Sequence, residues 1–402
     1  MREMMLVSHV VNASVSEGFL PAAQNLGLHV VLLTDCAEQQ RQYFSQPGLP
    51  AYPDEIISCD VFNPVSLIET IAERNAPPQA IFSNSDHLQT STAIAADYFS
   101  LPGKDWQVTY RAKNKAQMRA YMKANQIDQL WHATVSNAQA LTTIAKTAPY
   151  PCVVKPREGV ASEQVSLVSN ASELEAYCSA LWHRQPEQVL LIEAYLSGEL
   201  YTLETLGDGQ QLQVLGGFKV ALSSPPSFVE LQANWGTGLS EAQHQAVVEQ
   251  ISQFGIGFGA CHTEFVMTEN GPRLIEINYR SIGDRRDLLM QDVLGMAYFE
   301  HVIRLYMGEP LPSLQQQTRA AAIHYFTTGK EGKIFQLPDG FNFQEKEISL
   351  RYESLKKKGD QLTLTHSNRD YLGVMSAIGP DAEQLSEVMG QHSANLNWEI
   401  HP

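Results

Sequence analysis

The sequence predicts an open parallel α/β domain followed by a longer α+β region, and three features lead to this prediction. Within residues 1–103, short apolar runs alternate with helical stretches, which is typical of an open parallel sheet. Within residues 152–278, apolar runs follow one another across tight turns, which indicates antiparallel hairpins. Residues 311–402 carry short apolar runs and one helical stretch, which predicts a small additional α+β unit.

The expected elements of the N-terminal region alternate along the chain. Helices are expected at 18–26 and 64–74, between strands at 4–10, 29–34, 55–58 and 80–82. The loop after the first strand, Val11-Asn12-Ala13-Ser14, lacks the Gly-x-Gly-x-x-Gly pattern, so no dinucleotide site is predicted there. Asp35, at the end of the second strand, could hold a ribose hydroxyl but is more simply a solvated carboxylate.

Two hairpins are expected in the middle of the chain. Gly207-Asp208-Gly209 separates strands 200–206 and 211–215, and Asn270-Gly271 separates strands 261–267 and 273–278. The remaining expected elements are helices at 114–125, 241–254 and 382–389 and strands at 321–326, 348–352, 361–366 and 371–378. Breaks at Leu101-Pro102-Gly103 and at 308–312 predict domain boundaries.

Composition and charge narrow the class of protein. The chain has 402 residues, 44% of them apolar, which is enough for two or three buried cores. Its net charge of −16 argues against a general nucleic-acid or membrane-surface binder, because both surfaces are anionic. The five cysteines include no Cys-x-x-Cys pair, and no run resembles a signal peptide or a membrane span, so a cytoplasmic protein is expected.

The strongest chemical signal lies in the second hairpin. Side chains two residues apart on a strand share a face, so Glu276 lies with Asn278, and His262 with Glu264. A loop of three or five residues centred on Asn270 would place the two glutamates opposite each other. Two carboxylates and an amide on a partly buried face suit Mg²⁺, with Mn²⁺ as an alternative. The competing interpretation is a hairpin whose polar face lies in solvent.

Two further segments carry groups suited to a nucleotide. A predicted strand ends at Lys155 and leads into a loop of small residues, where an ammonium and backbone N–H groups can meet phosphate. Residues 189–199 form a predicted strand and hinge, whose edge can offer backbone groups to adenine and a carboxylate to ribose. Each segment is weak evidence alone, because a Lys-Pro turn and a strand–turn–strand unit are both common.

In this order and spacing, the three segments resemble the ATP-grasp superfamily, specifically its carboxylate–amine ligase branch, which includes L-amino acid and dipeptide ligases. The resemblance covers nearly the whole chain. It implies an α/β pre-ATP-grasp domain over 1–103, an ATP-grasp module of antiparallel sheets and helices over 104–310 with a lid at about 115–190, and a C-terminal α+β domain over 311–402. It also implies ATP and Mg²⁺ as cofactors and leaves a homodimer open.

The resemblance assigns roles residue by residue. The residues matching its ATP contacts are Lys115, Lys155, Ser162, Glu193, Ala194, Leu196 and Glu199. The residues matching its magnesium ligands are Glu264, Glu276 and Asn278, and Lys155 and Arg280 match its catalytic residues. The phosphate loop departs from the family pattern, because only Gly159 remains where more glycines are usual. The segment after Asn278 also departs, which leaves the substrate undefined.

The reaction that the resemblance implies joins a small-molecule carboxylate to an amine. Phosphoryl transfer from ATP makes an acylphosphate, the amine attacks it, and ADP and phosphate are released. Substrate contacts are expected from His262, Arg280, Arg285 and Arg286, although the last two fit a solvated turn equally well. The expected products are peptide-like metabolites, siderophores among them. A bicarbonate-activating carboxylase and a nucleotide-binding module without catalysis remain alternatives.

Residues 223–238 are predicted to form a lid loop. Pro225-Pro226 cannot continue a strand ladder, Gly236 permits unusual backbone angles, and the segment is long for a passive connection. Glu230 is expected to accept a substrate ammonium, and Trp235 to close over the substrate and exclude water. The competing interpretation is that the aromatic residues only pin the loop to the core.

Overall fold

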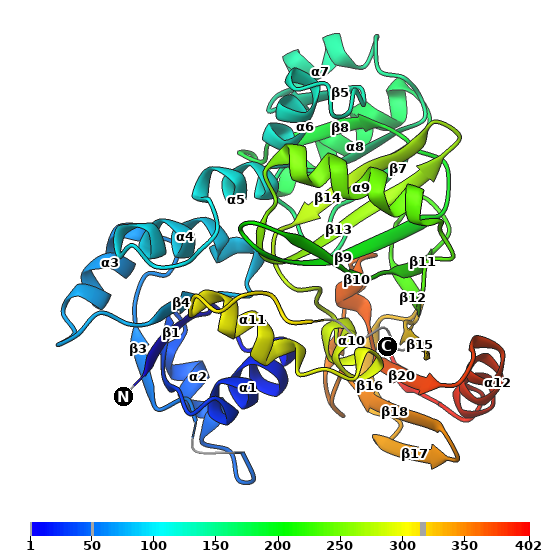
Figure 1. Ribbon diagram of the computed structural model, residues 1–402. Coiled ribbons are helices and arrows are strands. Elements are labelled where there is room, and N and C mark those ends of the chain that lie inside the picture. Colours follow the sequence, from blue (N-terminus) through cyan, green and yellow to red (C-terminus); the bar gives the residue numbers. More distant parts are fainter. Residues whose placement is uncertain (1, 50–51, 314–318) are drawn as a thin grey trace.

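The computed structural model describes residues 2–49, 52–313 and 319–402, which contain four sheets (Figure 1). The N-terminal sheet is parallel with the order β3-β2-β1-β4, and its strands are β1 (Glu3–Val7), β2 (His29–Thr34), β3 (Glu55–Ser58) and β4 (Ala80–Phe82). Its helices are α1 (Leu20–Asn25), α2 (Ala37–Phe44), α3 (Pro64–Ala72) and α4 (Gln89–Tyr98). This arrangement confirms the predicted parallel α/β construction.

The first helical segment differs from its prediction. A π-helical turn, Ser14–Phe19, precedes α1, and the side chain of Asn12 accepts a hydrogen bond from Val15 N at 3.1 Å. A Cβ on Gly18 would lie 2.5 Å from the ring of Phe299. The glycine therefore allows a distant helix, α11 (Tyr298–Tyr306), to pack directly on this turn.

A second, antiparallel sheet has the order β5-β8-β6-β7, and we call it the lid sheet. Its strands are β5 (His132–Val135), β6 (Cys152–Pro156), β7 (Ser166–Val168) and β8 (Leu190–Ala194). The helices of this part of the chain are α5 (Trp106–Lys113), α6 (Lys115–Ala124), α7 (Ala138–Ile144) and α8 (Ala171–Arg184). Apolar side chains of α7, α8 and the strands form one core, so the lid sheet has its own support.

The large sheet has the order β14-β13-β9-β11-β12-β15-β20-β18-β17, with β10 paired to β9. Its first strands are β9 (Leu200–Asp208), β10 (Leu212–Gly216), β11 (Phe218–Leu222), β12 (Glu230–Trp235), β13 (Phe258–Thr268) and β14 (Gly271–Asn278). Helix α9 (Glu241–Phe254) spans the predicted range, because a capping box at Ser240 begins it and left-handed Gly255 ends it. Helix α10 (Arg286–Leu294) follows the hairpin.

The C-terminal strands continue the large sheet. They are β15 (Ala320–Phe326), β17 (Phe341–Glu345), β18 (Ile348–Ser354) and β20 (Gly373–Gly379), and α12 (Ala382–Ser393) packs on β20. A small sheet joins β19 (Gln361–Leu362), β16 (Gly332–Gln336) and β21 (Glu399–His401). Because β12 pairs with β15, one sheet runs across the boundary predicted at residue 310, and the three-domain division stays a prediction.

Two predicted elements need correction. Residues 223–238 are not a continuous loop, because they contain β12, which is paired on both edges by β11 and β15. The strand predicted at 361–366 ends at Leu362, since the carboxylate of Asp370 accepts hydrogen bonds from Thr365 N and His366 N. In the described ranges, no helix has the length and apolar character that a membrane crossing requires.

Candidate active site

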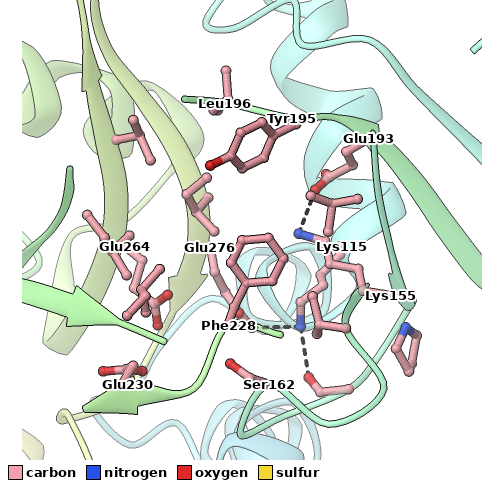
Figure 2. A pocket seen from close by; sticks show the side chains of 18 of the residues that line it. Lys115, Lys155, Ser162, Glu193, Tyr195, Leu196, Phe228, Glu230, Glu264 and Glu276 are labelled. Atoms are coloured by element: carbon pink, nitrogen blue, oxygen red, sulfur yellow. Dashed lines mark hydrogen bonds and ion pairs between the residues drawn. The ribbon is translucent and has the colours of Figure 1, made fainter. Parts of the chain in front are cut away.

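The candidate active site is a cleft between the lid sheet and the large sheet (Figure 2). Nine of the residues singled out in the sequence line it: Lys115, Lys155, Ser162, Glu193, Ala194, Leu196, Glu230, Glu264 and Glu276. Apolar side chains separate the charged groups, among them Val153, Val160, Leu200, Phe228, Val266 and Ile275. An apolar cleft with a few placed charges is typical of small-molecule sites.

The hairpin β13–β14 sets the two predicted metal carboxylates side by side. Glu264 pairs directly with Glu276, and His262 pairs with Asn278, as the sequence predicted. The turn itself differs from the prediction, because Thr268 pairs with Gly271 and only two residues lie between them. A β-bulge beyond Glu264 shifts the register by one residue and restores the facing pairs.

Acidic groups accumulate on this wall of the cleft. His262 lies between two of them, with Nδ1 2.8 Å from Glu204 Oε1 and Nε2 3.2 Å from Glu264 Oε1. Burial would lower the pKa of His262, but Glu204 and Glu264 raise it to about 9. Asn278 Nδ2 donates to Glu264 Oε1 at 3.4 Å, which leaves the amide oxygen free to act as a ligand.

Lys115 connects the two walls of the cleft. It begins α6, and its buried ammonium lies 2.7 Å from Glu276 Oε1 and donates to Gly159 O at 2.8 Å (Figure 2). Burial would lower the pKa of Lys115, but Glu276 raises it. The ammonium therefore stays charged between the acidic hairpin and the loop after β6.

The opposite wall holds a buried network of ion pairs and hydrogen bonds, and its central residue, Arg119, was not predicted from the sequence. Glu193 Oε2 lies 2.5 Å from Lys155 Nζ, and Arg119 Nε donates to Glu193 Oε1. Arg119 also donates to Leu274 O at 2.7 Å and to Ile275 O at 3.2 Å, which ties the lid sheet to β14. Burial would raise the pKa of Glu193, but Arg119 and Lys155 lower it to about 2. A signal was available: Arg119 lies four residues after Lys115 and shares its helix face.

The hinge after β8 contributes to the lining of the cleft. Ala194, Tyr195 and Leu196 line the cleft, and the ring of Phe228 lies 6.3 Å from the ring of Tyr195. These two rings suit contact with a flat aromatic base. Glu199 does not line the cleft, because its carboxylate lies 2.5 Å from Lys219 Nζ and is largely exposed.

The loop after β6 takes up glycine-like backbone conformations without the glycines. Ala161, Ser162 and Gln164 have φ values of 57°, 55° and 57°. Such conformations cost non-glycine residues of order 1 kcal/mol each and are concentrated at functional sites. The loop therefore departs from the family pattern in composition, while its backbone keeps left-handed conformations at three positions.

Arg280 lies beside a second cavity. This cavity is lined by Asn12, Ala13, Ser14, Asn84, Arg280, Gly283, Asp284, Arg285, Tyr325, Leu355, Tyr371 and Val374. It lies where the loops after β1 and β4 meet, which is the topological switch point of the parallel sheet. Arg280 Nε lies 3.9 Å from Asp86 Oδ1, and Lys113 donates to the same carboxyl group.

Three predicted substrate residues form ion pairs within the protein. Arg286 Nη1 lies 2.7 Å from Glu230 Oε2, and both side chains are buried, so Glu230 is not a free acceptor for an ammonium. Arg285 forms ion pairs with Glu17 at 2.9 Å and Glu353 at 2.6 Å. Both arginines of the turn therefore have carboxylate partners in this structure, and their contact with a substrate stays a prediction.

Trp235 is also placed differently from its prediction. Its ring packs edge-on against Phe218 with centroids 5.0 Å apart, and a Cβ on Gly216 would lie 2.4 Å from it. Trp235 does not line the cleft, and its place in β12 fixes it to the core. The core-packing interpretation therefore holds for this residue.

Comparison with known proteins agrees with this geometry. Residues 148–287 match the ATP-grasp domain family. The uncharacterized protein y4rH of Sinorhizobium fredii is 25% identical over 315 residues, which cover 76% of this chain and 64% of that protein. The crystal structure of L-amino acid ligase from Bacillus licheniformis superposes with a TM-score of 0.81 at 19% identity, covering 100% of this chain and 99% of that one.

Two further structures share the fold. Phosphoribosylglycinamide synthetase from Anaerococcus prevotii has a TM-score of 0.72 at 15% identity and covers 100% of both chains. The biotin carboxylase domain of 2-oxoglutarate carboxylase from Hydrogenobacter thermophilus, solved with MgADP and bicarbonate, has a TM-score of 0.71 at 17% identity, covering 99% of this chain and 90% of that one. Residues 148–287 therefore carry an ATP-grasp domain, and the chain as a whole shares the fold of these structures.

Proposed function

We propose that this protein is an ATP- and Mg²⁺-dependent ligase that activates a carboxylate as an acylphosphate and couples it to an amine. One observation carries the proposal: the facing carboxylates Glu264 and Glu276 share a cleft with the lysines Lys115 and Lys155. The lysines suit the phosphates of a nucleoside triphosphate, and the carboxylates suit the cation bound to those phosphates.

The donor set fits magnesium. Glu264, Glu276 and Asn278 offer hard oxygen atoms, and the two carboxylates are only about one-fifth exposed, at 18% and 20%. When bound there, Mg²⁺ would supply neutralisation of phosphate charge. Lys115 would share this role, because its ammonium lies 2.7 Å from Glu276 Oε1 in the same cleft.

The protein's own groups account for the remaining steps. Lys155 would donate to phosphate oxygens, and the left-handed loop at Ala161 and Ser162 would cover them with N–H groups. Arg280 would hold the substrate carboxylate and then the transferred phosphoryl group. Because the acid–base work is small, positioning and charge neutralisation supply most of the rate enhancement.

The second cavity is the proposed place of the organic substrates. It adjoins Arg280, which follows Asn278 by two residues, and it carries amide groups at Asn12 and Asn84. Asp284 also lines it, and its carboxylate would accept a hydrogen bond from a substrate amine. The identity of the substrates and a role in siderophore assembly stay predictions.

A matrix of carboxylates and amines, assayed by phosphate release, tests the proposal. ADP formation should require one carboxylate and one amine, and hydroxylamine in place of the amine should trap the acylphosphate as a hydroxamate. ADP formation with bicarbonate as the activated acid would instead indicate a carboxylase. ATP binding without turnover on any pair would indicate a module that binds nucleotide without catalysis.

A further inference from the structure

Three side chains of different chemistry meet at the carboxyl edge of the N-terminal sheet, outside the cleft. His9 follows β1, and Asp35 and Cys36 follow the neighbouring β2. One ligand atom of each lies within 4.8 Å of the others. The proposed ligase reaction uses none of the three.

Their spacing fits a tetrahedral metal. His9 Nδ1 lies 3.5 Å from Cys36 Sγ, and 2.7 Å and 2.9 Å from the two oxygens of Asp35. Around a tetrahedral Zn²⁺, nitrogen and sulfur ligands would stand about 3.5 Å apart, and nitrogen and oxygen ligands about 3.3 Å apart. The His9–Cys36 spacing already matches, and a small rotation of the Asp35 carboxylate supplies the rest.

The backbone that carries these ligands is fixed by further contacts. Thr34 Oγ1 donates to His9 O at 3.0 Å and accepts from Cys36 N at 3.1 Å. Gln40 Nε2 also donates to His9 O at 3.0 Å. One buried threonine thus holds both ligand-bearing loops, as an outer shell does in metal sites.

A second triad in the same domain already contains a cation from the protein itself. Glu3, His29 and Glu55 also lie within 4.8 Å of one another. There Arg74 lies between the carboxylates, at 2.5 Å from Glu3 and 2.9 Å from Glu55, and supplies the cation itself. At His9, Asp35 and Cys36, no lysine or arginine of the described ranges forms an ion pair with Asp35.

We propose that His9, Asp35 and Cys36 form a binding site for a borderline-soft divalent transition metal of the Zn²⁺ class. The ligand set combines imidazole, carboxylate and thiolate, which disfavours Mg²⁺ and favours Zn²⁺ or Co²⁺. Three protein ligands leave a fourth position open to water or a small molecule. His87, in the turn Asp86–Leu88 after β4, lies at the same edge of the sheet.

Titration of the whole chain with Co²⁺ tests the site, because a thiolate ligand gives Co²⁺ an intense charge-transfer absorption that oxygen ligands do not. The native protein should develop this absorption with one equivalent, and Zn²⁺ should remove it. Cys36→Ser should abolish the band, and His9→Gln should weaken Co²⁺ binding at least about tenfold, since even outer-shell losses cost 10–100-fold. Glu276→Gln should leave the band unchanged.

Cys59→Ser is the matched control. Cys59 follows β3 at the same sheet edge, but its thiol contacts Ser66 and Thr70 instead of a histidine or carboxylate. This variant should keep the native titration. A band that survives Cys36→Ser, a native protein that develops no band, or binding only at a large excess of metal would overturn the proposal. Circular dichroism of each variant separates loss of the site from loss of the fold.

Discussion

The lid wall and the hairpin wall of the cleft are both charged and buried, but they satisfy their charges differently. On the lid wall, Glu193 lies between Arg119 and Lys155, so each carboxylate oxygen has a cationic partner. On the hairpin wall, the carboxylates of Glu204, Glu264 and Glu276 face one imidazolium and the ammonium of Lys115. On the lid wall the carboxylate charge is fully compensated, and Lys155 keeps further N–H donors for phosphate, whereas the hairpin wall has more carboxylates than cations.

This difference predicts that the ion pairs of the lid wall mainly stabilise the fold, whereas the carboxylates of the hairpin wall mainly bind a ligand. Removing one partner of a buried ion pair leaves an uncompensated charge and destabilises the fold. Removing one of several crowded carboxylates relieves repulsion instead. Substitutions on the lid wall should therefore act first on stability, and those on the hairpin wall first on activity.

The largest effect is expected from Glu276→Gln on the hairpin wall. Turnover should fall by about 100-fold or more, because metal-centred charge stabilisation contributes several kcal/mol. The melting temperature should fall only slightly, because Lys115 loses Glu276 but keeps its hydrogen bond to Gly159 O, and the repulsion between Glu276 and Glu264 is relieved. Glu269→Gln, in the exposed turn of the same hairpin, is the control and should change neither turnover nor melting temperature. Unchanged turnover of Glu276→Gln at saturating Mg²⁺ would remove the hairpin from the mechanism.

Arg119→Met on the lid wall should lower the free energy of unfolding by about 3 kcal/mol, because Glu193 loses one of its two cationic partners and the carbonyl groups of Leu274 and Ile275 lose their donor. Urea denaturation measures the loss. Lys123→Met, on the exposed face of the same helix, should change stability little. If Arg119→Met kept full stability and raised only the KM for ATP, the proposed division between the walls would fail.

Lys104 differs from the charged groups of both walls, because this buried cation forms no ion pair within the described ranges. Its Nζ donates to Gln89 Oε1 and Tyr279 O, and burial lowers the pKa of Lys104 from 10.5 to about 7. The unfolded chain therefore binds more protons between these values, so this residue makes stability rise with pH, by up to about 1.4 kcal/mol per unit.

Lys104→Met should flatten that rise in denaturant titrations between pH 7 and 10. The exposed Lys146→Met should leave the slope unchanged and serves as the control. An identical slope in both variants would mean that Lys104 keeps an ordinary pKa in the folded protein.

The smallest effect is expected from Glu199→Gln. The carboxylate lies outside the cleft and is 60% exposed, so the KM for ATP should change less than about twofold. An increase of tenfold or more in that KM would show that the nucleotide reaches Glu199, as the resemblance to the family implies.

The fold could be predicted where local patterns carry it. Apolar runs, turns and a capping box are local in sequence, and they account for the strands His29–Thr34 and Glu55–Ser58 and the helix Glu241–Phe254. The facing pair Glu264 and Glu276 also followed from strand alternation, although a bulge rather than the turn sets the register. Residues 223–238 were mispredicted because β15, the partner of β12, lies far along the chain.

The sequence by itself indicated the resemblance to ATP-grasp proteins and most of the cleft residues, because the spacing of these residues along strands fixes which side chains share a face. Only the tertiary structure decided which charged groups are free. Arg286 is bound to Glu230, Arg285 to Glu17, and Lys155 to Glu193, and each partner comes from a distant part of the chain. The availability of a buried charge depends on its neighbours in space, and a sequence lists neighbours only along the chain.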